Sequence, residues 1–462
     1  MSARWRFEPR VFELGDVQPL DALSALRERS GLVLLDSAAG TPRRHSILAF
    51  DPLPAPASPP RSLRDLRELW RTLELRPHDP VPGPFHGGLL ALLPYDLGIA
   101  GERAVATAPE PWGEDQLIAG LYVDFIVRDE LSSRAWLVLG HAPGDGRAPV
   151  EERREALLAE LASAPRAGPI HAQAPLRHVP SAEHLARIER CRAAIARGEI
   201  YQANLAHRFT CEAQGDPIDW YARLRAVNPA PYMCFARWRD AVEGERALLS
   251  ASPELLLEYD GELARTRPIK GTARRSVDAE LDARAARELL ESPKDRAELA
   301  MIVDLERNDL ARVCEPRGVW VEGFPTLASY ARVHHLMADV VGRPRAGLDA
   351  FDLLGALFPG GSVTGAPKLR AMEWIAALEG EGRGLFCGSA GYVDARGRAN
   401  WNILIRTLVW RGRSRAQGQF SFRVGGGITW PSDAHAEERE TLDKAQGLLD
   451  ALCEGPARVA SA

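Results

Sequence analysis

The stretch Pro268-Ile269-Lys270-Gly271-Thr272 places a lysine between a strand-like hydrophobic run and a glycine turn. Upstream, Ser252-Pro253-Glu254 supplies a candidate acidic partner. A lysine in a buried or charged pocket can become a neutral amine and so act as a nucleophile or a base. A lysine after a strand is usually a solvated surface group, so this hypothesis depends on what the rest of the chain places around it.

The bulk composition is that of an ordinary globular protein. The chain has 462 residues, of which 45% are hydrophobic and 26% charged. This length is enough for two or three average domains or for one large domain. The formal net charge of −5 argues against binding of nucleic acid through a broad basic surface. We therefore expect no nucleic-acid partner, whereas a local basic site for a small anion stays open.

Neither a membrane segment nor an export signal is predicted. The chain has no apolar run of ~18 residues, so we expect no transmembrane helix. Its first ten residues are not followed by the apolar core of a signal peptide. The six cysteines are scattered without CxxC spacing, which is typical of reduced thiols. We expect a cytoplasmic protein with no membrane partner.

Strand-like and helical segments alternate in a pattern typical of α+β layers with largely antiparallel sheets. An N-terminal region at 1–163, which contains two strands over 31–50, is followed by a linker at 164–180 and a C-terminal region at 181–455. Ser181 is predicted to cap a helix. The predicted long strands fall into adjacent groups, namely 204–212 with 247–259, and 383–394 with 401–411 and 419–428.

Two pairs of carboxylates have i,i+3 spacing, which places both members of a pair on one face of a helix. Four oxygen donors from two helices suit a hard cation such as Mg²⁺, although each pair alone could be a solvated helix face. Lys444 follows the second pair by four residues and is either a surface salt-bridge partner or a cation that meets a substrate. The carboxylates are Asp295 and Glu298 in the helical stretch 293–303, and Glu437 and Glu440 in the helical stretch 434–452.

Two glycine-rich segments indicate sites where an anion could meet the backbone. The loop 359–368, which contains Ser362, leads into a helix that is expected to end near Leu378, so free backbone N–H groups can face an anion. Gly425-Gly426-Gly427 follows a predicted strand and lets a ligand approach the backbone closely. Neither segment matches a nucleotide-binding motif, and each alone could be a tight turn.

Arg406 falls in the apolar stretch 403–408, which predicts a strand. An arginine in such a strand needs an anionic partner or an exposed face, and its guanidinium can bind a carboxylate with two hydrogen bonds. His335 and Tyr392 are weaker candidates, because a lone histidine or tyrosine is more often a structural group.

Taken together, these segments resemble the chorismate-utilising enzymes over about residues 180–450, in order. The resemblance implies an α+β fold with a large two-layered antiparallel β-sheet sandwich flanked by helices, to which residues 1–163 contribute. The matching strings are Tyr201-Gln202-Ala203-Asn204-Leu205, Ser252-Pro253-Glu254, Pro268-Ile269-Lys270-Gly271-Thr272, Asp304-Leu305-Glu306-Arg307-Asn308-Asp309, Val333-His334-His335-Leu336, Phe358-Pro359-Gly360-Gly361-Ser362-Val363-Thr364-Gly365-Ala366-Pro367-Lys368, Gly388-Ser389-Ala390-Gly391-Tyr392, Ile405-Arg406-Thr407 and Gly425-Gly426-Gly427-Ile428.

Two positions point to a branch of this family. The lysine at 270 resembles the branch that makes aminodeoxychorismate for 4-aminobenzoate and folate, whereas anthranilate-forming members typically have alanine there. Water-using members carry a lysine base where this chain has Gln202, and a glutamine cannot activate water as a base. The resemblance therefore implies the ammonia-using aminodeoxychorismate branch. An anthranilate synthase component I and a non-catalytic tryptophan- or chorismate-binding relative are the alternatives.

The resemblance also implies roles for the candidate residues. Lys270 would attack C2 of chorismate, Glu254 or Lys270 would help the 4-hydroxyl leave, and His335 would steer the substrate. Ammonia would then add at C4 and expel the lysine from C2; because no glutaminase motif is evident, a separate glutamine amidotransferase subunit would supply the ammonia. Mg²⁺ would be held by Glu298 and Glu440 with Asp295 and Glu437 nearby, and further substrate contacts would come from Gly271, Thr272, Ser362, Tyr392, Arg406, Gly425, Gly426, Gly427 and Lys444.

A second ligand site is implied near the N-terminus. Asp36, Ser37 and Ser46, with the segment 228–233, resemble the tryptophan pocket of the family. Tryptophan bound there is inhibitory in anthranilate synthases and can be structural in the aminodeoxychorismate branch. The chain departs from the family pattern at Asn400-Trp401-Asn402, at Leu299 after the first metal glutamate, and at Asp295, where some relatives have glutamate.

Overall fold

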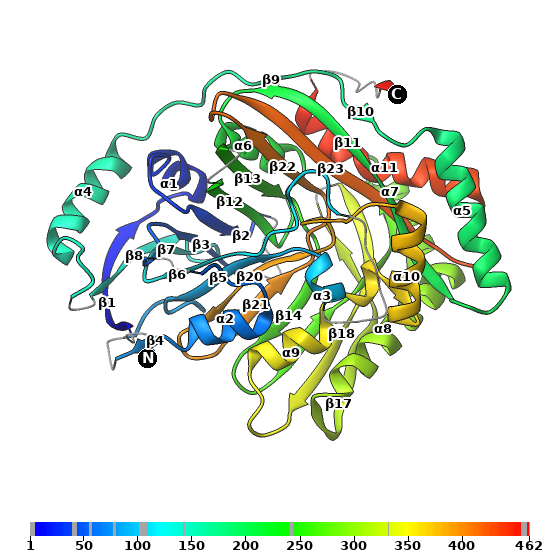
Figure 1. Ribbon diagram of the computed structural model, residues 1–462, viewed down its shortest axis with the longest axis horizontal. Helices are drawn as coiled ribbons and strands as arrows, with labels where there is room; N and C mark the ends of the chain where they lie inside the picture. Colours follow the sequence, from blue (N-terminus) through cyan, green and yellow to red (C-terminus); the bar gives the residue numbers. More distant parts are fainter. Residues whose placement is uncertain are drawn as a thin grey trace.

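The computed structural model describes residues 5–38, 44–54, 58–76, 80–100, 109–141, 144–240, 244–330, 332–453 and 460–461. Within these ranges the strands form two large sheets, and most neighbouring strands are antiparallel. The predicted α+β fold with large antiparallel sheets is confirmed. The helices flank the sheets: α1 and α4 lie at one end of the molecule and α5, α10 and α11 at the other (Figure 1).

The first sheet is the larger of the two, with 15 strands among the described residues. Its order across the sheet is β24 (Ala460–Ser461), β10 (Leu176–Arg177), β11 (Gln202–Gln214), β23 (Gln417–Ile428), β22 (Thr407–Gly412), β13 (Gly244–Ser250), β12 (Met233–Asp240), β2 (Val33–Asp36), β3 (His45–Ala49), β7 (Asp124–Asp129), β8 (Arg134–His141), β1 (Trp5–Gly15) and β4 (Leu73–Leu75), with β9 (His171–Ala172) and β19 (Gly365–Ala366) on β11.

The second sheet contains the strand with the candidate lysine. Its order is β16 (Ile269–Arg274), β18 (Val333–Pro344), β15 (Ala264–Arg267), β14 (Leu255–Tyr259), β21 (Ala399–Asn402), β20 (Ser389–Asp394), β5 (Gly88–Leu93) and β6 (Ile118–Tyr122), with β17 (Cys314–Ser329) on β18.

The helices are α1 (Pro19–Ala25), α2 (Leu63–Trp70), α3 (Asp96–Ala100), α4 (Val150–Ala162), α5 (Ser181–Ala196), α6 (Pro217–Val227), α7 (Ala279–Glu291), α8 (Pro293–Ala311), α9 (Ala350–Leu357), α10 (Lys368–Glu379) and α11 (Ala434–Leu452), with a short 3₁₀ turn, η1 (Gly361–Val363). No helix of the described residues is both long and apolar enough to cross a membrane.

The hydrophobic core has layers that follow from this order. One buried cluster joins the two sheets, since it combines Leu35 and Leu248 of the first with Leu90 and Ala390 of the second. A second cluster lies between the first sheet and helices including α1, α6 and α11. A third lies between the second sheet and helices including α8 and α9. The sheets therefore form the two middle layers of a sandwich covered by helices.

Residues 1–163 contribute strands to both sheets. β2 pairs with β12 in the first sheet, and β5 pairs with β20 in the second. The predicted linker 164–180 contains the short strands β9 and β10, both of which pair with β11. Residues 454–459, at the predicted end of the C-terminal region, lie outside the described residues.

Three expectations about local structure were wrong. The predicted strand 247–259 is divided into β13 and β14, which belong to different sheets, because the chain crosses between sheets at Ser252-Pro253-Glu254. Proline lacks the N–H that a continuous strand would need. β11 is separated from β13 by β23 and β22. Ser181 does not cap α5: Pro180 occupies the cap position, and the Ser181 hydroxyl contacts Glu438 instead.

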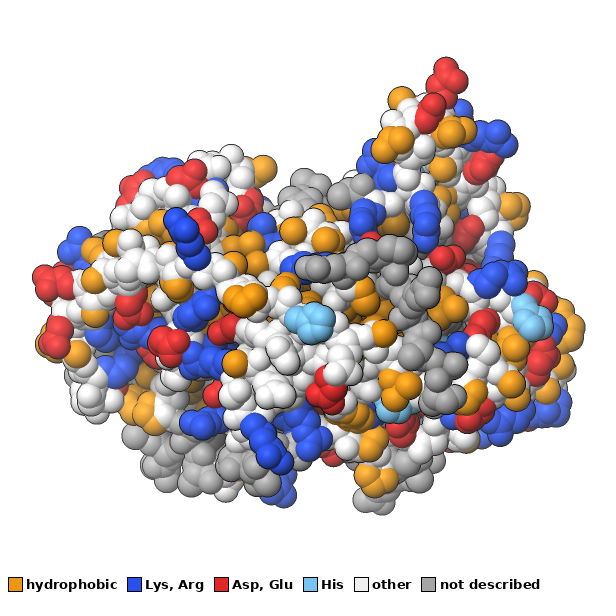
Figure 2. Space-filling view, turned by 90° about the horizontal axis from the view of Figure 1, so that it is seen from above, with side chains coloured by type: hydrophobic (Ala, Val, Ile, Leu, Met, Phe, Trp, Pro, Cys, Tyr) orange, Lys and Arg blue, Asp and Glu red, His pale blue; other side chains and the backbone are white. Residues whose placement is uncertain are grey.

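The surface carries charges of both signs. Lysine and arginine side chains are interspersed with aspartate and glutamate on the face seen in Figure 2. This mixture accords with the formal net charge of −5.

Candidate active site

A cavity of about 750 Å³ brings together most of the predicted site residues. Its walls come from β16, β18, β23, α8, α11 and the loop before α10. The predicted residues that line it are Glu254, Lys270, Gly271, Thr272, Asp295, Glu298, His335, Ser362, Arg406, Gly425, Gly427, Glu437, Glu440 and Lys444. Segments that are almost 200 residues apart in sequence therefore form one site.

Lys270 projects from β16 beside a bulge. The pairing of β16 with β18 shifts between Lys270 and Thr272, and Gly271 has a φ of +79°, a conformation that glycine adopts without strain. A Cβ at Gly271 would lie 2.9 Å from Asp295 Oδ1, so glycine also lets α8 approach the strand. Nζ of Lys270 donates a hydrogen bond to the Ser362 carbonyl at 3.1 Å.

The surroundings of Lys270 favour its neutral amine. Burial lowers the pKa of Lys270, and the positive charge of Lys444 lowers it further. Glu298, Glu254 and Glu440 act in the opposite direction but do not reverse the shift. Desolvation and a like charge are two ways in which proteins make a lysine nucleophilic.

Glu254 lies where the chain crosses from the first sheet to the second. Its side chain is buried, and its Oε1 accepts the N–H of Ile269 at 3.3 Å, next to Lys270. Burial raises the pKa of Glu254, against the lowering effects of Ser362 and Lys270. The carboxyl can therefore hold a proton in the same cavity as the amine.

Arg406 lies at the return crossing, not within a strand as predicted. It occupies the connection between β21 and β22 with a φ of +53°, which is strained for a residue other than glycine. The two crossings are held together, because Ser252 Oγ donates to the Ile403 carbonyl at 2.6 Å and the Ile403 N–H donates to the Glu254 carbonyl at 3.1 Å. This arrangement brings Glu254 and Arg406 to one cavity.

His335 connects Arg406 with β16. Its Nε2 lies 3.2 Å from Arg406 Nη2, and its Nδ1 lies 3.0 Å from Thr272 Oγ1 and 3.2 Å from the Gly271 carbonyl. Because arginine can only donate, Nε2 is the acceptor and the proton is on Nδ1. Burial and the charge of Arg406 lower the pKa of His335 to about 3.

The three glycines lie inside β23, not in a turn after it. Gly425, Gly426 and Gly427 pair with Ala206, Leu205 and Asn204 of β11. A Cβ at Gly426 would lie 3.4 Å from Lys444 Nζ, and one at Gly427 would lie 3.5 Å from Lys270 Nζ. The absence of side chains keeps the space between the strand and both lysines open to a ligand.

Gln202 lies behind Gly427. A Cβ at Gly427 would be 2.9 Å from Gln202 Nε2, so the amide and Lys270 flank the same point. Gln202 is completely buried, and neither its amide nitrogen nor its amide oxygen has a hydrogen-bond partner among the described residues. Buried polar groups without partners are rare and often mark a site that is completed by a bound molecule.

The predicted metal ligands come from two helices on one cavity. Glu440 is paired with Lys444 at 2.8 Å, Glu437 accepts from Ser432 Oγ at 2.6 Å, and Glu298 lies 3.9 Å from Lys294. Burial raises the pKa of Glu298 and of Glu437, and neighbouring carboxylates raise both further. A cation would relieve this repulsion.

Carboxylate oxygens are the donors that Mg²⁺ prefers, so the chemistry of the set fits the ion. Within the part of the chain that the structure describes, no group of three such side chains converges closely enough to hold a metal as they stand. Binding of Mg²⁺ would therefore require Glu437 to release Ser432 and Glu440 to release Lys444.

Tyr392 lies elsewhere. It is buried in the core between the two sheets, where its ring packs edge-on against Phe85 at 5.2 Å, and it is not among the residues that line the cavity. Its position in β20, opposite Leu90 of β5, directs the ring into that core. Tyr392 is therefore not placed to contact a ligand in this cavity.

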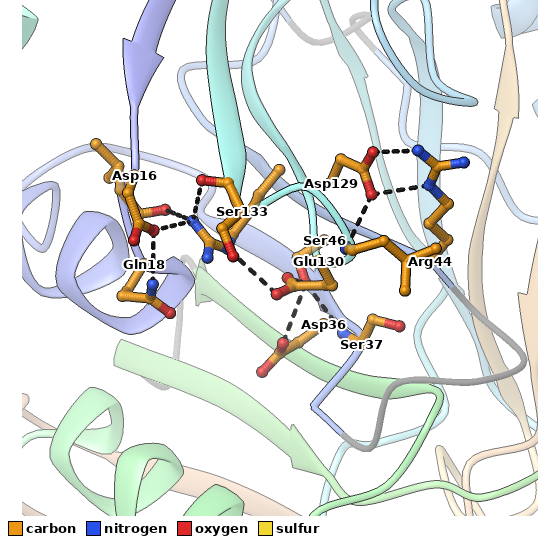
Figure 3. Close-up of polar contacts among 12 residues, drawn as sticks. Asp16, Gln18, Asp36, Ser37, Arg44, Ser46, Asp129, Glu130 and Ser133 are labelled. Carbon is orange, nitrogen blue, oxygen red and sulfur yellow. Dashed lines mark hydrogen bonds and ion pairs between the residues drawn. The ribbon is translucent and has the colours of Figure 1, made fainter.

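The predicted tryptophan pocket is a separate buried cluster. Figure 3 shows Ser46 between Asp36 and Glu130, with Arg44 paired with Asp129. The Ser37 N–H donates to Ser46 Oγ at 3.1 Å. Asp36 is completely buried and also accepts from Tyr221 Oη at 3.0 Å and Arg225 Nε at 2.6 Å. Tryptophan binding here stays a prediction, and it would compete with these contacts.

Several cavity residues had no predicted role. Asn204, Lys294, Arg332 and Arg423 line the same cavity. Arg423 lies in the largely apolar stretch 420–424, just as Arg406 lies in 403–408. The reasoning that selected Arg406 could therefore also have selected Arg423. Lys294 and Arg332 are surface-type residues in sequence, and only the fold places them at the cavity.

A family model described as chorismate binding enzyme matches residues 39–450. Anthranilate synthase component 1 of Streptomyces coelicolor is 36% identical over 457 residues, which are 94% of this chain and 86% of that protein. Aminodeoxychorismate synthase component 1 of Klebsiella aerogenes is 38% identical over 383 residues, which are 82% of this chain and 80% of that protein.

Solved structures support the same relationship. Anthranilate synthase component I from Streptococcus pneumoniae has a TM-score of 0.73 at 28% identity and covers 88% of this chain and 92% of its own. The menaquinone-specific isochorismate synthase of Escherichia coli also has a TM-score of 0.73, at 19% identity, and covers 98% and 96%. The second likeness shows the fold alone.

Proposed function

The chain belongs to the chorismate binding enzyme family, and we propose that it converts chorismate and ammonia to 4-amino-4-deoxychorismate as component 1 of an aminodeoxychorismate synthase. The observation that carries the proposal is Lys270, whose amine lies in the cavity with a lowered pKa, beside the buried carboxyl of Glu254. A covalent route through a lysine needs this combination of amine and acid.

In the first step, Nζ of Lys270 forms a bond to C2 of chorismate. The ring double bonds shift and the C4–O bond breaks, while Glu254 gives its proton to the hydroxyl, which leaves as water. Arg406 and the backbone amides of Gly425–Gly427 would bind a carboxylate of the substrate, and Arg406, Gly425 and Gly427 line the cavity. His335 holds Arg406 and does not itself titrate near neutral pH.

In the second step, ammonia forms a bond to C4, the double bonds shift back, and the C2–N bond to Lys270 breaks. The amine is restored, and the excess proton on the new amino group passes to the Glu254 carboxylate. We place the incoming ammonia beside the Gln202 amide oxygen, which can accept its N–H without removing a proton. Overall, one chorismate and one ammonia give one aminodeoxychorismate and one water.

Glu298 and Glu440, with Asp295 and Glu437 nearby, would hold Mg²⁺. When bound, Mg²⁺ would act as a Lewis acid that neutralises the ring carboxylate of chorismate. Lys444 lies beside Glu440 and Gly426, which supports a contact of its ammonium with a substrate carboxylate.

We propose that a glutamine amidotransferase subunit supplies the ammonia. The relatives named component 1 support a second component. All six cysteines are free thiols, and five of them are buried. Free thiols are typical of proteins of the reducing cytoplasm. We propose that the chain acts there, in the formation of 4-aminobenzoate and folate.

Anthranilate synthesis is the second candidate function. It is favoured by the Streptomyces coelicolor relative, which aligns with 94% of this chain. In that reaction ammonia adds at C2, the carbon that Lys270 would occupy in the aminodeoxychorismate route.

One experiment separates the two functions. The purified chain is incubated with chorismate, MgCl₂ and ammonium chloride at pH 8, and the products are separated and identified by mass spectrometry. We expect aminodeoxychorismate as the main product. Anthranilate as the main product would establish the second function, and isochorismate would exclude both.

A further inference from the structure

We propose that the buried ion pair between Arg177 and Glu438 sets the rotation of α11 about its axis and thereby positions Glu437 and Glu440 in the cavity. Arg177 and Glu438 have no assigned part in the reaction. The inference rests on the proposed role of Glu437 and Glu440 as Mg²⁺ ligands.

The contact is bidentate and enclosed. Arg177 Nη1 donates to Glu438 Oε1 at 2.6 Å, and Nη2 lies 3.1 Å from Oε2. Ser181 Oγ donates to Glu438 Oε1 at 2.8 Å. The two charged side chains are 6% and 10% exposed, so solvent screens this pair far less than the surface pairs of the chain. A forked guanidinium–carboxylate contact fixes direction as well as distance.

Helix geometry relates this contact to the cavity. Successive residues of an α-helix are rotated by about 100°, so Glu438 projects from a different side of α11 than Glu437. Glu437, Glu440 and Lys444 line the cavity, whereas Glu438 does not. A rotation of α11 that moved Glu438 off Arg177 would therefore turn both candidate metal ligands out of their present directions.

Arg177 is itself held by the sheet that forms the cavity wall. It pairs with Phe209 of β11. Residues 204–206, which lie nearer the N-terminal end of β11, pair with Gly425–Gly427 of β23. Arg177 Nη2 also lies 3.3 Å from His207 Nδ1, and the His207 ring packs against Phe209 at 5.0 Å and His184 at 4.3 Å. The guanidinium is thus fixed relative to Gly425–Gly427, and it transmits that position to α11.

A merely structural pair and a positioning pair predict different results for one double variant. In Arg177→Met with Glu438→Met, packing replaces charge, and such replacements often keep a fold stable. A structural pair then leaves Mg²⁺ affinity intact whenever the fold is intact. A positioning pair loses its directional contact, so Mg²⁺ affinity falls even though the thermal midpoint is kept.

The test measures Mg²⁺ binding to the full chain by isothermal titration calorimetry, and thermal unfolding in parallel without Mg²⁺. We expect the double methionine variant to bind Mg²⁺ at least fivefold more weakly than the parent, and its kcat to return to within twofold of the parent at saturating Mg²⁺. Arg27→Met with Asp219→Met, which removes a comparably enclosed pair between the segment after α1 and α6, should leave Mg²⁺ affinity unchanged.

Unchanged Mg²⁺ affinity in the double methionine variant would overturn the proposal. If that variant does not fold, Arg177→Lys serves in its place, because it keeps the charge and loses the fork. It should weaken Mg²⁺ binding by twofold or more, and an unchanged affinity again overturns the proposal. Should the parent bind no Mg²⁺ while it still turns over chorismate, the assigned ligands and this inference both fall but the reaction stands.

Discussion

Arg406 Nη2 donates to His335 Nε2 across 3.2 Å, and this bond assigns the imidazole its role. The histidine is neutral, with its proton on Nδ1 facing the Gly271 carbonyl and Thr272 Oγ1. It therefore orients the guanidinium and does not deliver a proton. The same ring connects β16, which carries Lys270, to the arginine that we propose binds the substrate.

Replacing His335 should affect substrate binding more than chemistry. In His335→Ala, Arg406 loses its acceptor, and we expect KM for chorismate to rise about tenfold while kcat falls less than threefold. His335→Gln can offer an amide oxygen to Arg406 and should recover part of the loss. Steady-state kinetics decide this, and a kcat lowered by a hundredfold with unchanged KM would assign the histidine to proton transfer instead.

Lys270→Ala should change the product. The variant lacks the covalent route but keeps Arg406, the glycine strand and the carboxylates, and the space that the lysine vacates lets ammonia reach C2. Total turnover should fall, and the remaining product should shift toward the 2-amino adduct and anthranilate. Product analysis by mass spectrometry tests this, and aminodeoxychorismate made at nearly the parent rate would reject Lys270 as nucleophile.

The adduct itself offers an independent check on Lys270. Intact-protein mass spectrometry after addition of chorismate and Mg²⁺ without ammonia should show a covalent species on the parent chain and none on Lys270→Ala. An adduct that persists in the variant would place the nucleophile elsewhere.

Glu298→Gln and Glu440→Gln each remove one charged oxygen donor from the cavity. We expect at least tenfold weaker Mg²⁺ binding and a matching rise in the Mg²⁺ concentration needed for half-maximal turnover, with the fold intact. Glu322→Gln, a substitution at a surface carboxylate of β17, is the control. If the Mg²⁺ concentration needed for half-maximal turnover is unchanged in both cavity variants, these residues are not the ligands.

Gln202→Leu should weaken the use of ammonia selectively. The buried amide flanks the point at Gly427 that Lys270 also flanks, so its loss should raise KM for ammonium at least fivefold and leave KM for chorismate within twofold. Initial rates over a matrix of the two substrates separate these effects. Equal changes in both constants would mean that Gln202 supports the cavity without contacting ammonia.

Glu306 should make stability depend on pH. It is buried with Thr266 Oγ1 at 2.9 Å, and burial and the nearby Glu254 raise the pKa of Glu306 from 4.5 to about 8. The folded chain thus keeps a proton that the unfolded chain releases, so the free energy of unfolding falls as pH rises from about 4.5 to 8. One pKa unit corresponds to about 1.4 kcal/mol.

Glu306→Gln removes this proton linkage and keeps an amide for Thr266. Its free energy of unfolding should exceed that of the parent by on the order of 2 kcal/mol at pH 8, and the two should converge near pH 5. Denaturant titrations at several pH values measure the difference. An offset between the two chains that does not change with pH would show that Glu306 is ionised in the fold.

The sequence predicts those cavity residues whose spacing along one helix or strand determines which face of that element their side chains occupy. Glu437, Glu440 and Lys444 share one face because they lie on one helix, and Lys270 is marked by its glycine neighbour. Tyr392 differs, because a strand has two buried faces here. Which face meets the other sheet depends on the register with β5, and a run of apolar residues does not encode that register.

Arg406 shows a second limit of sequence reasoning. Arg406 and Thr407 are the only polar residues in the stretch 403–408, and the stretch contains no glycine or proline, so no turn residue marks the passage of the chain from one sheet to the other. The carboxylate pairs have a related limit: their spacing predicts a shared face, whereas their contacts with Lys444 and Ser432 depend on the tertiary fold.

The strand order also has a consequence for the nascent chain. β11 and β13 leave the ribosome early, but the hairpin of β22 and β23 that separates them follows more than 150 residues later. At cellular translation rates, that gap amounts to roughly eight to thirty seconds during which two strand edges lack their partners. Synthesis thus passes through a stage with open, aggregation-prone edges, and the hairpin that closes them brings the glycines of the cavity with it.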